Sequence, residues 1–285
     1  MSGKEKLKLV AWSLLFFVGG LVLAQLLILL LVRLLLVPGS GFLWVTAVET
    51  SALLLSYGAM TWLIGARVLR FTRTDLEQLP PERGHRLRRF GWGSLLGVVL
   101  AVIALLVAVP TGQAGWHTSG PSLLSWLGKV GVIGCILLPA ALAEELAFRG
   151  VPVLALSKAF GRVPAIVALA LLFALAHSDN PSVTWLALLN IAIAGVFLGL
   201  VFFTPGGLWT STGAHLGWNL TLAALGAPVS GIPLELPWLS YAPGHPAWLT
   251  GGGFGPEGGV LASICLLAGS VLVAKRSAVP RGATT

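Results

Sequence analysis

Long apolar runs constrain the fold of this chain more than any other feature. Hydrophobic residues make up 56% of its 285 residues, charged residues only 10%, and the mean hydropathy is +0.91. A helix needs roughly 20 apolar residues to cross the hydrocarbon core of a bilayer, and several runs reach that length. We therefore predict an all-α fold, a polytopic transmembrane helical bundle, and exclude an ordinary soluble domain.

About eight membrane spans can be placed along the sequence. The fourth contains Gly150 and Pro152, which can bend a helix, although the apolar residues that follow would extend it towards Lys158. The predicted spans are 9–37, 42–66, 91–110, 123–150, 163–179, 183–203, 207–227 and 258–274.

Basic residues fall on one side of this eight-span arrangement, and the loops on the other side contain no Lys or Arg. The positive-inside rule therefore predicts that both termini are cytoplasmic, and we expect a multi-pass protein of a bacterial inner membrane. The formal net charge of +8 reflects this topology and attraction to anionic membrane lipids, so no nucleic-acid partner is expected. The basic residues on this side are Lys4, Lys6, Lys8, Arg67, Arg70, Arg73, Arg83, Arg86, Arg88, Arg89, Lys158, Arg162, Lys275, Arg276 and Arg281. Arg33 and Lys129 lie near the non-cytoplasmic ends of their spans and are interpreted as reaching to the interface. The loops without them are 38–41, 111–122, 180–182 and 228–257.

The chain divides by composition into three parts. We expect spans one to three with a basic cytoplasmic loop in 1–120, a core of spans four to seven in 121–227, and a Gly/Pro-rich non-cytoplasmic loop with the last span in 228–285. The aromatic residues of 228–257 favour a belt at the membrane interface, and a substrate-binding lid is the alternative.

Two adjacent acids end the apolar run of the fourth span. Ionisable side chains within lipid-facing helices cost at least ~2.5 kcal/mol each, so they usually face a bundle interior and mark function. Glu145 and Arg149 are four residues apart, on one helix face, and are predicted to form an ion pair. Glu144 points ~140° away from Arg149 and stays unpaired. Such a carboxylate in a low-dielectric bundle is a candidate general base.

Two later spans each place a histidine inside an apolar run. His177 follows Phe173 by four residues, and His215 precedes Asn219 by four, so each pair shares a helix face. If the fourth helix continues to Lys158, Glu144 and His177 both lie ~21 Å from the cytoplasmic boundary; if it ends at Gly150, this match fails. We predict that these side chains converge on one cavity.

This ordered set of motifs resembles the CPBP family of intramembrane proteases, which includes CAAX prenyl endopeptidases and bacteriocin-processing or immunity proteins. The resemblance covers residues 123–227 and rests on Glu144-Glu145-x-x-x-Arg149, Phe173-x-x-x-His177 and His215-x-x-x-Asn219. It implies an intramembrane endopeptidase that acts on a membrane-anchored or lipid-modified protein or peptide substrate. The peptide bond would lie near the membrane.

The resemblance also implies a role for each matched residue. Glu144 and His177 would activate the attacking water, and His215 and Asn219 would stabilise the oxyanion. Glu145 and Arg149 would form the supporting ion pair, with Phe173 as packing. No cofactor is assigned; a divalent metal such as zinc would take Glu144, His177 and His215, but a metal-free reaction is favoured.

Two other classes stay open from the sequence. A non-proteolytic membrane adaptor or immunity protein would share the same architecture. A transporter would also keep polar groups inside the bundle, and the further candidates for its path are Gln25, Glu49 and Asn190. Of these, we interpret Glu49 as a structural acid. Cys135 and Cys265 show no metal-ligand spacing and are interpreted as small core residues.

Overall fold

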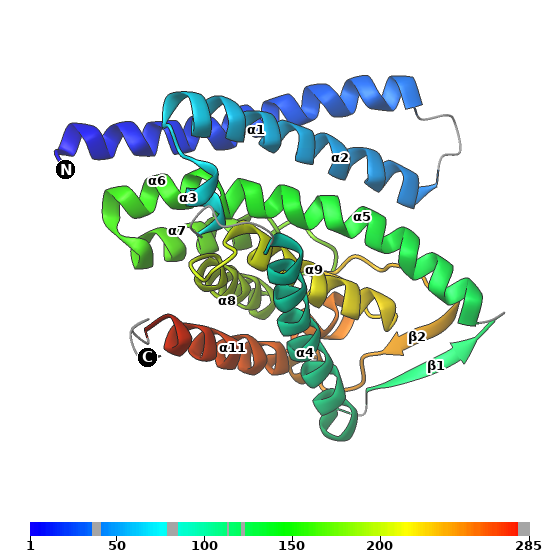
Figure 1. Ribbon diagram of the computed structural model, residues 1–285. Coiled ribbons are helices and arrows are strands. Elements are labelled where there is room, and N and C mark those ends of the chain that lie inside the picture. Colours follow the sequence, from blue (N-terminus) through cyan, green and yellow to red (C-terminus); the bar gives the residue numbers. More distant parts are fainter. Residues whose placement is uncertain (36–40, 79–84, 113, 121–122, 279–285) are drawn as a thin grey trace.

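The computed structural model describes residues 1–35, 41–78, 85–112, 114–120 and 123–278. Arg83, Arg281 and parts of the predicted loops 38–41 and 111–122 lie outside the described residues. The described chain is mainly helical, with long helices packed side by side (Figure 1). The all-α polytopic fold is thereby confirmed.

Nine longer helices form the body of the described part of the chain. They are α1 (Gly3–Leu35), α2 (Phe42–Met60), α4 (Arg86–Gly112), α5 (Leu123–Arg149), α6 (Val151–Phe160), α7 (Arg162–Leu175), α8 (Trp185–Phe202), α9 (Leu208–Ala224) and α11 (Val260–Ala278). A π-helix, η1 (Thr61–Val68), continues α2. The shorter elements are α3 (Arg73–Glu77), α10 (Ala247–Thr250), the 3₁₀ turns η2 (Gly252–Phe254) and η3 (Pro256–Gly258), and the strands β1 (Gly115–Ser119) and β2 (Trp238–Ala242).

Helices occupy each predicted span, but not all of them meet the length of a full crossing. By length and composition, five helical stretches of the described residues are long and apolar enough to cross a membrane. They are Gly3–Leu35, Phe42–Val68, Arg86–Gly112, Leu123–Phe160 and Trp185–Phe202. Arg162–Leu175 and Val260–Lys275 are shorter apolar helices. The count of eight crossings therefore stays a prediction.

Gly150 interrupts the fourth predicted span. Its φ of −85° and ψ of −122° are not helical, and α6 begins at the next residue with Pro152 in its first turn. A Cβ at this position would lie 2.4 Å from the carbonyl oxygen of Leu146, so only glycine fits the bend. The apolar helical course nevertheless continues to Phe160. The helix thus neither runs unbroken to Lys158 nor ends at Gly150: it breaks at Gly150 and then resumes. The predicted match in depth between Glu144 and His177 is therefore not decided by the helix length.

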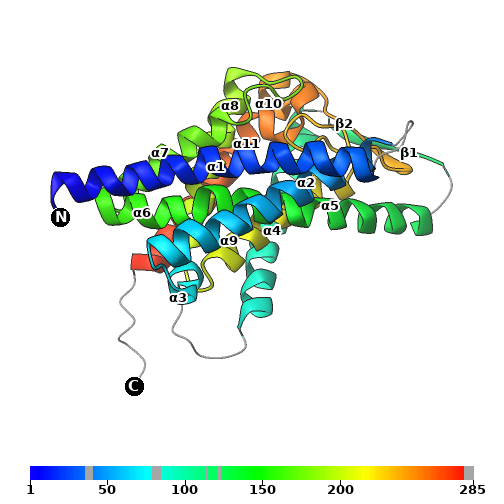
Figure 2. The same ribbon diagram turned by 90° about the horizontal axis from the view of Figure 1, so that it is seen from above.

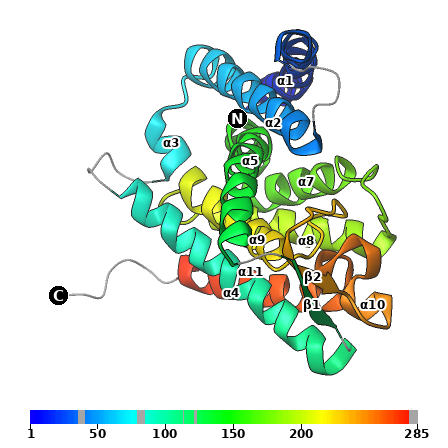
Figure 3. The same ribbon diagram turned by 90° about the vertical axis from the view of Figure 1, so that its right-hand side faces the viewer.

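Helices α1 and α2 pair along one side of the molecule, against α5 and α6 (Figures 1 and 3). Phe16 of α1 packs on Tyr57 of α2 with ring centroids 5.6 Å apart. The opposite face of α1 exposes a series of large apolar side chains, among them Leu14, Leu15 and Val18. An exposed apolar face of this kind is what a lipid-facing helix presents.

Small residues bring α4 and α9 into close contact. A Cβ at Gly97 of α4 would lie 2.1 Å from the carbonyl oxygen of Ala214, and one at Gly217 of α9 would lie 2.2 Å from that of Ser94. Such small-residue interfaces let membrane helices approach with backbones nearly touching. This packing holds α9, which carries His215 and Asn219, at the centre of the bundle (Figure 3).

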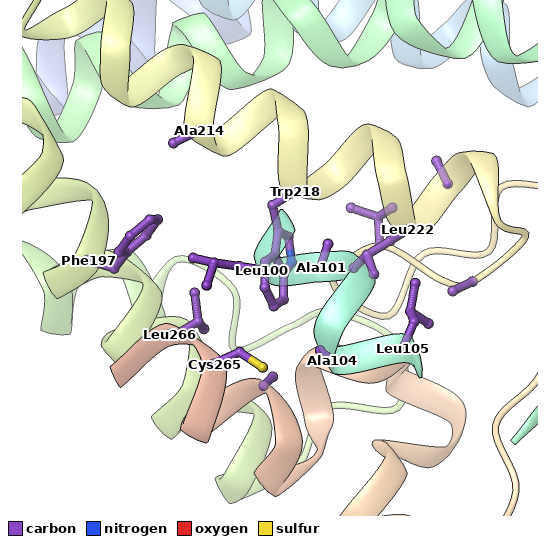
Figure 4. Packing of buried hydrophobic residues seen from close by; sticks show 14 of the residues in the cluster. Leu100, Ala101, Ala104, Leu105, Phe197, Ala214, Trp218, Leu222, Cys265 and Leu266 are labelled. Carbon is purple, nitrogen blue, oxygen red and sulfur yellow. The ribbon is translucent and has the colours of Figure 1, made fainter. Parts of the chain in front are cut away.

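Trp218 carries the apolar core from α9 towards α4. Figure 4 shows its ring beside Leu100 and Ala101 of α4, with Leu266 and Cys265 of α11 close by. Cys265 is buried in this cluster and Cys135 is exposed, so the prediction that both cysteines lie in the core is wrong for Cys135. Its position faces outward from α5, where the surrounding solvent is expected to be lipid.

The loops on one side contain a small antiparallel sheet that the sequence did not indicate. Strands β1 and β2 pair in register, with Gly115 opposite Ala242 and Trp116 opposite Tyr241. The rings of Trp116 and Tyr241 lie 5.6 Å apart between centroids. Since pairs of aromatic side chains across strands stabilise a hairpin-like sheet, this contact supports the pairing.

Figures 1 and 2 place the start of α1, the α6–α7 junction and the end of α11 together at one end of the molecule, with the sheet at the other. Lys6 of α1 accordingly lies over the ring of Phe160, with Nζ 5.5 Å from its centroid. Three of the basic segments predicted to be cytoplasmic, at the start of α1, between α6 and α7 and at the end of α11, therefore lie at the same end of the molecule. Which side of a membrane this end faces stays a prediction.

Candidate active site

Glu145 and Arg149 form the predicted ion pair, and both side chains are buried. Arg149 Nη1 lies 3.0 Å from Glu145 Oε1, with side-chain exposures of 2% and 0%. Arg149 also donates from Nη2 to the carbonyl oxygen of Gly195 at 3.3 Å. Its guanidinium carbon lies 4.4 Å from the centre of the Phe173 ring. The buried charge on each partner is therefore compensated.

Glu145 has a second partner that its local spacing did not predict. His215 Nδ1 lies 3.0 Å from Glu145 Oε1, across the gap between α9 and α5. Because a carboxylate only accepts hydrogen bonds, Nδ1 carries the proton and donates it. This contact fixes the ring orientation and leaves Nε2 of His215 directed at the cavity.

The predicted span 163–179 placed His177 inside a helix, and this prediction is wrong. Helix α7 ends at Leu175, and His177 lies in the turn that follows. Its Nδ1 is 2.7 Å from the carbonyl oxygen of Phe173, to which it donates. The Phe173 ring lies 4.6 Å from the His177 ring and 6.1 Å from the His215 ring, so Phe173 separates and orients the two imidazoles.

Glu144 faces both imidazoles without touching either. Its Oε2 lies 3.8 Å from Nε2 of His215 and 4.0 Å from Nε2 of His177, which is too long for a direct hydrogen bond. That oxygen is buried and has no hydrogen-bond partner among the described residues. Groups at this separation can share a water molecule, which would bond to the carboxylate and to an imidazole together.

A cavity of about 330 Å³ connects these groups. Its polar wall includes Glu144, His177, His215 and Asn219, so the structure brings together the four residues predicted to be catalytic. Asn219 is half-buried, and its amide has no hydrogen-bond partner in the described part of the chain. The amide is thus available to a ligand. The rest of the wall is mainly apolar and includes Phe42, Leu43, Ile133, Ile136, Leu137, Phe197, Val229, Ile232, Leu234 and Leu266.

Sequence reasoning missed Glu257 and Ser230, which also line the cavity. Both belong to the segment 228–257, whose interpretation as an interfacial belt did not foresee residues beside the site. Burial raises the pKa of Glu257, while hydrogen bonds from Ser230 and Trp218 and the proximity of His177 act in the opposite direction. A lone acid in a Gly/Pro-rich loop gives no local signal, so only the tertiary structure identifies it.

The remaining polar candidates do not line the cavity. Gln25 and Glu49 are exposed on the outer faces of α1 and α2. Asn190 is buried but donates from Nδ2 to the carbonyl oxygens of Glu257 and Gly259, both at 2.8 Å. Its role is therefore structural, and the polar path that a transporter would need does not extend through these three residues.

The donor types at the site match those that zinc accepts, with imidazole nitrogens and a carboxylate. Within the described ranges, however, no group of three His, Cys, Asp or Glu side chains is arranged so that it could hold a metal ion. The residues therefore do not fit a metal in this geometry, and no reaction step below depends on one.

Fold and site together define a class: a polytopic helical membrane protein with a glutamate and histidine site that faces a mainly apolar cavity. Residues 124–221, from α5 through most of α9, match the family described as type II CAAX prenyl endopeptidase Rce1-like. Within this region the chain is similar, at the level of the family, to CAAX-type proteases, and the region contains Glu144, His177, His215 and Asn219. No curated protein matches the chain.

Proposed function

We propose that the protein is an intramembrane endopeptidase that cleaves a peptide bond near the membrane in a lipid-modified or membrane-anchored protein. One observation carries this proposal: Glu144 Oε2, buried and without a hydrogen-bond partner among the described residues, lies about equally far from two imidazole nitrogens. Water held between these groups has a base on one side and room for a carbonyl carbon on the other.

In the proposed reaction, Glu144 removes a proton from water that Nε2 of His177 helps to position. The resulting hydroxide oxygen bonds to the carbonyl carbon, and the carbonyl oxygen becomes an oxyanion. Glu144 then transfers its proton to the amide nitrogen, and the C–N bond breaks to give a carboxylic acid and an amine. The acid passes its proton to the amine, so the products leave as a carboxylate and an ammonium group.

His215 and Asn219 would stabilise the oxyanion. Nδ1 of His215 is occupied by Glu145, so the doubly protonated ring would donate from Nε2 while the Glu145 carboxylate compensates its charge. The side-chain amide of Asn219, four residues further along α9, would supply a second donor. Preorganised donors of this kind are effective because they do not have to reorient during the reaction.

The cavity wall supports a substrate with an apolar part next to the cleaved bond. Side chains from α2, α5, α8 and α11 line the apolar wall, and the matched family acts on prenylated proteins in general. The proposal therefore extends to a lipid-modified or membrane-embedded terminus as substrate and to membrane lipids as its surroundings.

A direct assay tests the function. Purified protein in lipid vesicles is incubated with matched peptides that carry a prenylated cysteine, an unmodified cysteine or a transmembrane anchor, and products are identified by mass spectrometry. We expect cleavage of at least one membrane-bound peptide, with Glu144→Ala protein inactive. If none of these peptides is cleaved and C-termini in source-cell membranes are the same with wild-type and Glu144→Ala protein, the adaptor or transporter hypothesis replaces the proposal.

Metal removal gives a separate prediction. Because Glu144 and the two imidazoles suffice for the proposed steps, dialysis against a chelator is expected to leave the cleavage rate unchanged. The measurement compares rates before dialysis, after dialysis and after zinc is added back. Loss of activity on dialysis that zinc restores would contradict the metal-free mechanism.

A further inference from the structure

Glu257 lies outside the family match, in the turn η3, and uses both carboxylate oxygens within the protein. Oε1 accepts a hydrogen bond from Trp218 Nε1 at 3.1 Å. Oε2 accepts from the backbone N–H of Ser230 at 2.5 Å and from its hydroxyl at 3.2 Å. The residue is 6% exposed, so these bonds compensate the desolvation of the carboxylate.

The first partner, Trp218, stands between two residues of the proposed site. On α9 it lies three residues after His215 and directly before Asn219, and its side chain lines the cavity. Figure 4 shows its ring extending from α9 towards Leu100 and Ala101 of α4. Because the indole has a single polar atom, the bond to Glu257 determines which way that edge of the ring faces.

The second partner, Ser230, is linked to the turn that carries His177. Asn180 donates from Nδ2 to the carbonyl oxygen of Ser230 at 2.8 Å, and its backbone N–H donates to the carbonyl oxygen of His177 at 3.2 Å. Ser230 has a φ of +48°, a left-handed conformation that non-glycine residues adopt only when their surroundings hold them there. Glu257 supplies two of the bonds that do so.

Glu257 is itself anchored to the helices beneath it. Asn190 of α8 donates to its carbonyl oxygen and to that of Gly259, and the hydroxyl of Ser263 on α11 donates to Asn190 Oδ1. The carboxylate thus projects from a backbone that two helices hold in place. From this point it reaches both sides of the site: α9 through Trp218 and the His177 turn through Ser230.

We propose that Glu257 is a positioning residue of the active site. By holding residues 228–232 over the cavity, it sets the His177 turn and the His215 to Asn219 stretch of α9 at the correct separation from Glu144. This inference rests on the proposed protease function. Residues after 221, which lie beyond the matched family region, would then contribute to catalysis through Glu257 and Ser230.

The test substitutes Glu257→Gln, which keeps the size of the side chain but places an NH₂ group against a donor of either Trp218 or Ser230. Small misplacements of reacting groups cost up to about 100-fold in rate, so we expect kcat to fall by about 10- to 100-fold with KM nearly unchanged. Ser230→Ala removes only the hydroxyl bond and is expected to lower kcat less. Glu235→Gln, an exposed acid in the same segment, is the matched control and should behave as wild type.

Wild-type and Glu144→Gln proteins are assayed beside these variants, so the two proposals can be judged separately. If wild type cleaves, Glu144→Gln does not, and folded Glu257→Gln keeps wild-type kcat, the positioning role is wrong while the protease function stands. A raised KM at unchanged kcat would likewise overturn it, since Glu257 would then only shape the cavity. If Glu257→Gln does not fold, a wild-type kcat in Ser230→Ala would show that the positioning role is wrong. A wild type that cleaves nothing overturns the function and the inference together.

Discussion

Glu144→Gln is expected to lower the cleavage rate by about 10²- to 10⁴-fold, the range typical for loss of a general acid or base. The amide is nearly the same size as the carboxylate but cannot take a proton from water. Since Glu144 Oε2 makes no hydrogen bond among the described residues, the substitution removes no bond at that oxygen that stabilises the fold. The measurement is kcat with a membrane-bound peptide substrate, together with the unfolding midpoint in detergent.

Glu49→Gln is a suitable control for this variant. Glu49 also lies on a membrane helix, but its side chain is exposed and does not line the cavity. We expect wild-type kcat from this protein. Full activity in Glu144→Gln, with the protein folded, would show that another group acts as the base and would remove the central residue from the proposed mechanism.

Arg149→Met is expected to destabilise the protein by about 3–5 kcal/mol, because removing one partner leaves the other charge buried and unpaired. Glu145 is 0% exposed and would keep its contact with His215 but lose the arginine that compensates its charge. The long methionine side chain still fills part of the space, so the loss reports chiefly on charge. Unfolding in mixed detergent micelles measures the difference from wild type.

A second substitution separates charge from packing. Arg149→Met combined with Glu145→Gln removes both charges, and we expect it to regain much of the lost stability while the enzyme stays inactive. Activity does not return because His215 no longer has a carboxylate to orient and charge-balance its ring. Arg33→Met, at an exposed position in α1, is the matched control and should change stability by less than about 0.5 kcal/mol. Equal stability of Arg149→Met and wild type would show that the pair does not matter for folding.

The features predicted correctly from the sequence depend on local spacing. The ion pair of Glu145 with Arg149 is present because residues four apart on a helix share a face, whatever the rest of the chain does. The helical spans follow from apolar runs, since a bilayer leaves a backbone few ways to satisfy its hydrogen bonds other than a helix. The bend at Gly150 was indicated by glycine and proline together.

Errors arose where local pattern carries little information. Helix α7 ends at Leu175 rather than at residue 179, because the backbone N–H groups of His177 and Ser178 bond to carbonyl oxygens three residues earlier instead of four. The β1–β2 pairing joins segments more than 100 residues apart, and neither strand alternates clearly between apolar and polar residues. The outward position of Cys135 was missed because a helix that faces both lipid and core is apolar all round.

Composition and spacing within one helix were enough to predict the class of fold and the Glu145–Arg149 pair, and they indicated four of the residues that line the candidate site. How those residues meet, and which loop residues join them, depends on the tertiary structure. The bond from His215 to Glu145, the distances from Glu144 to both imidazoles and the contacts of Glu257 each cross between elements. Such contacts depend on how the helices rotate about their axes and pack. A membrane helix that is apolar on all sides has no sequence pattern that shows which face points to the protein interior.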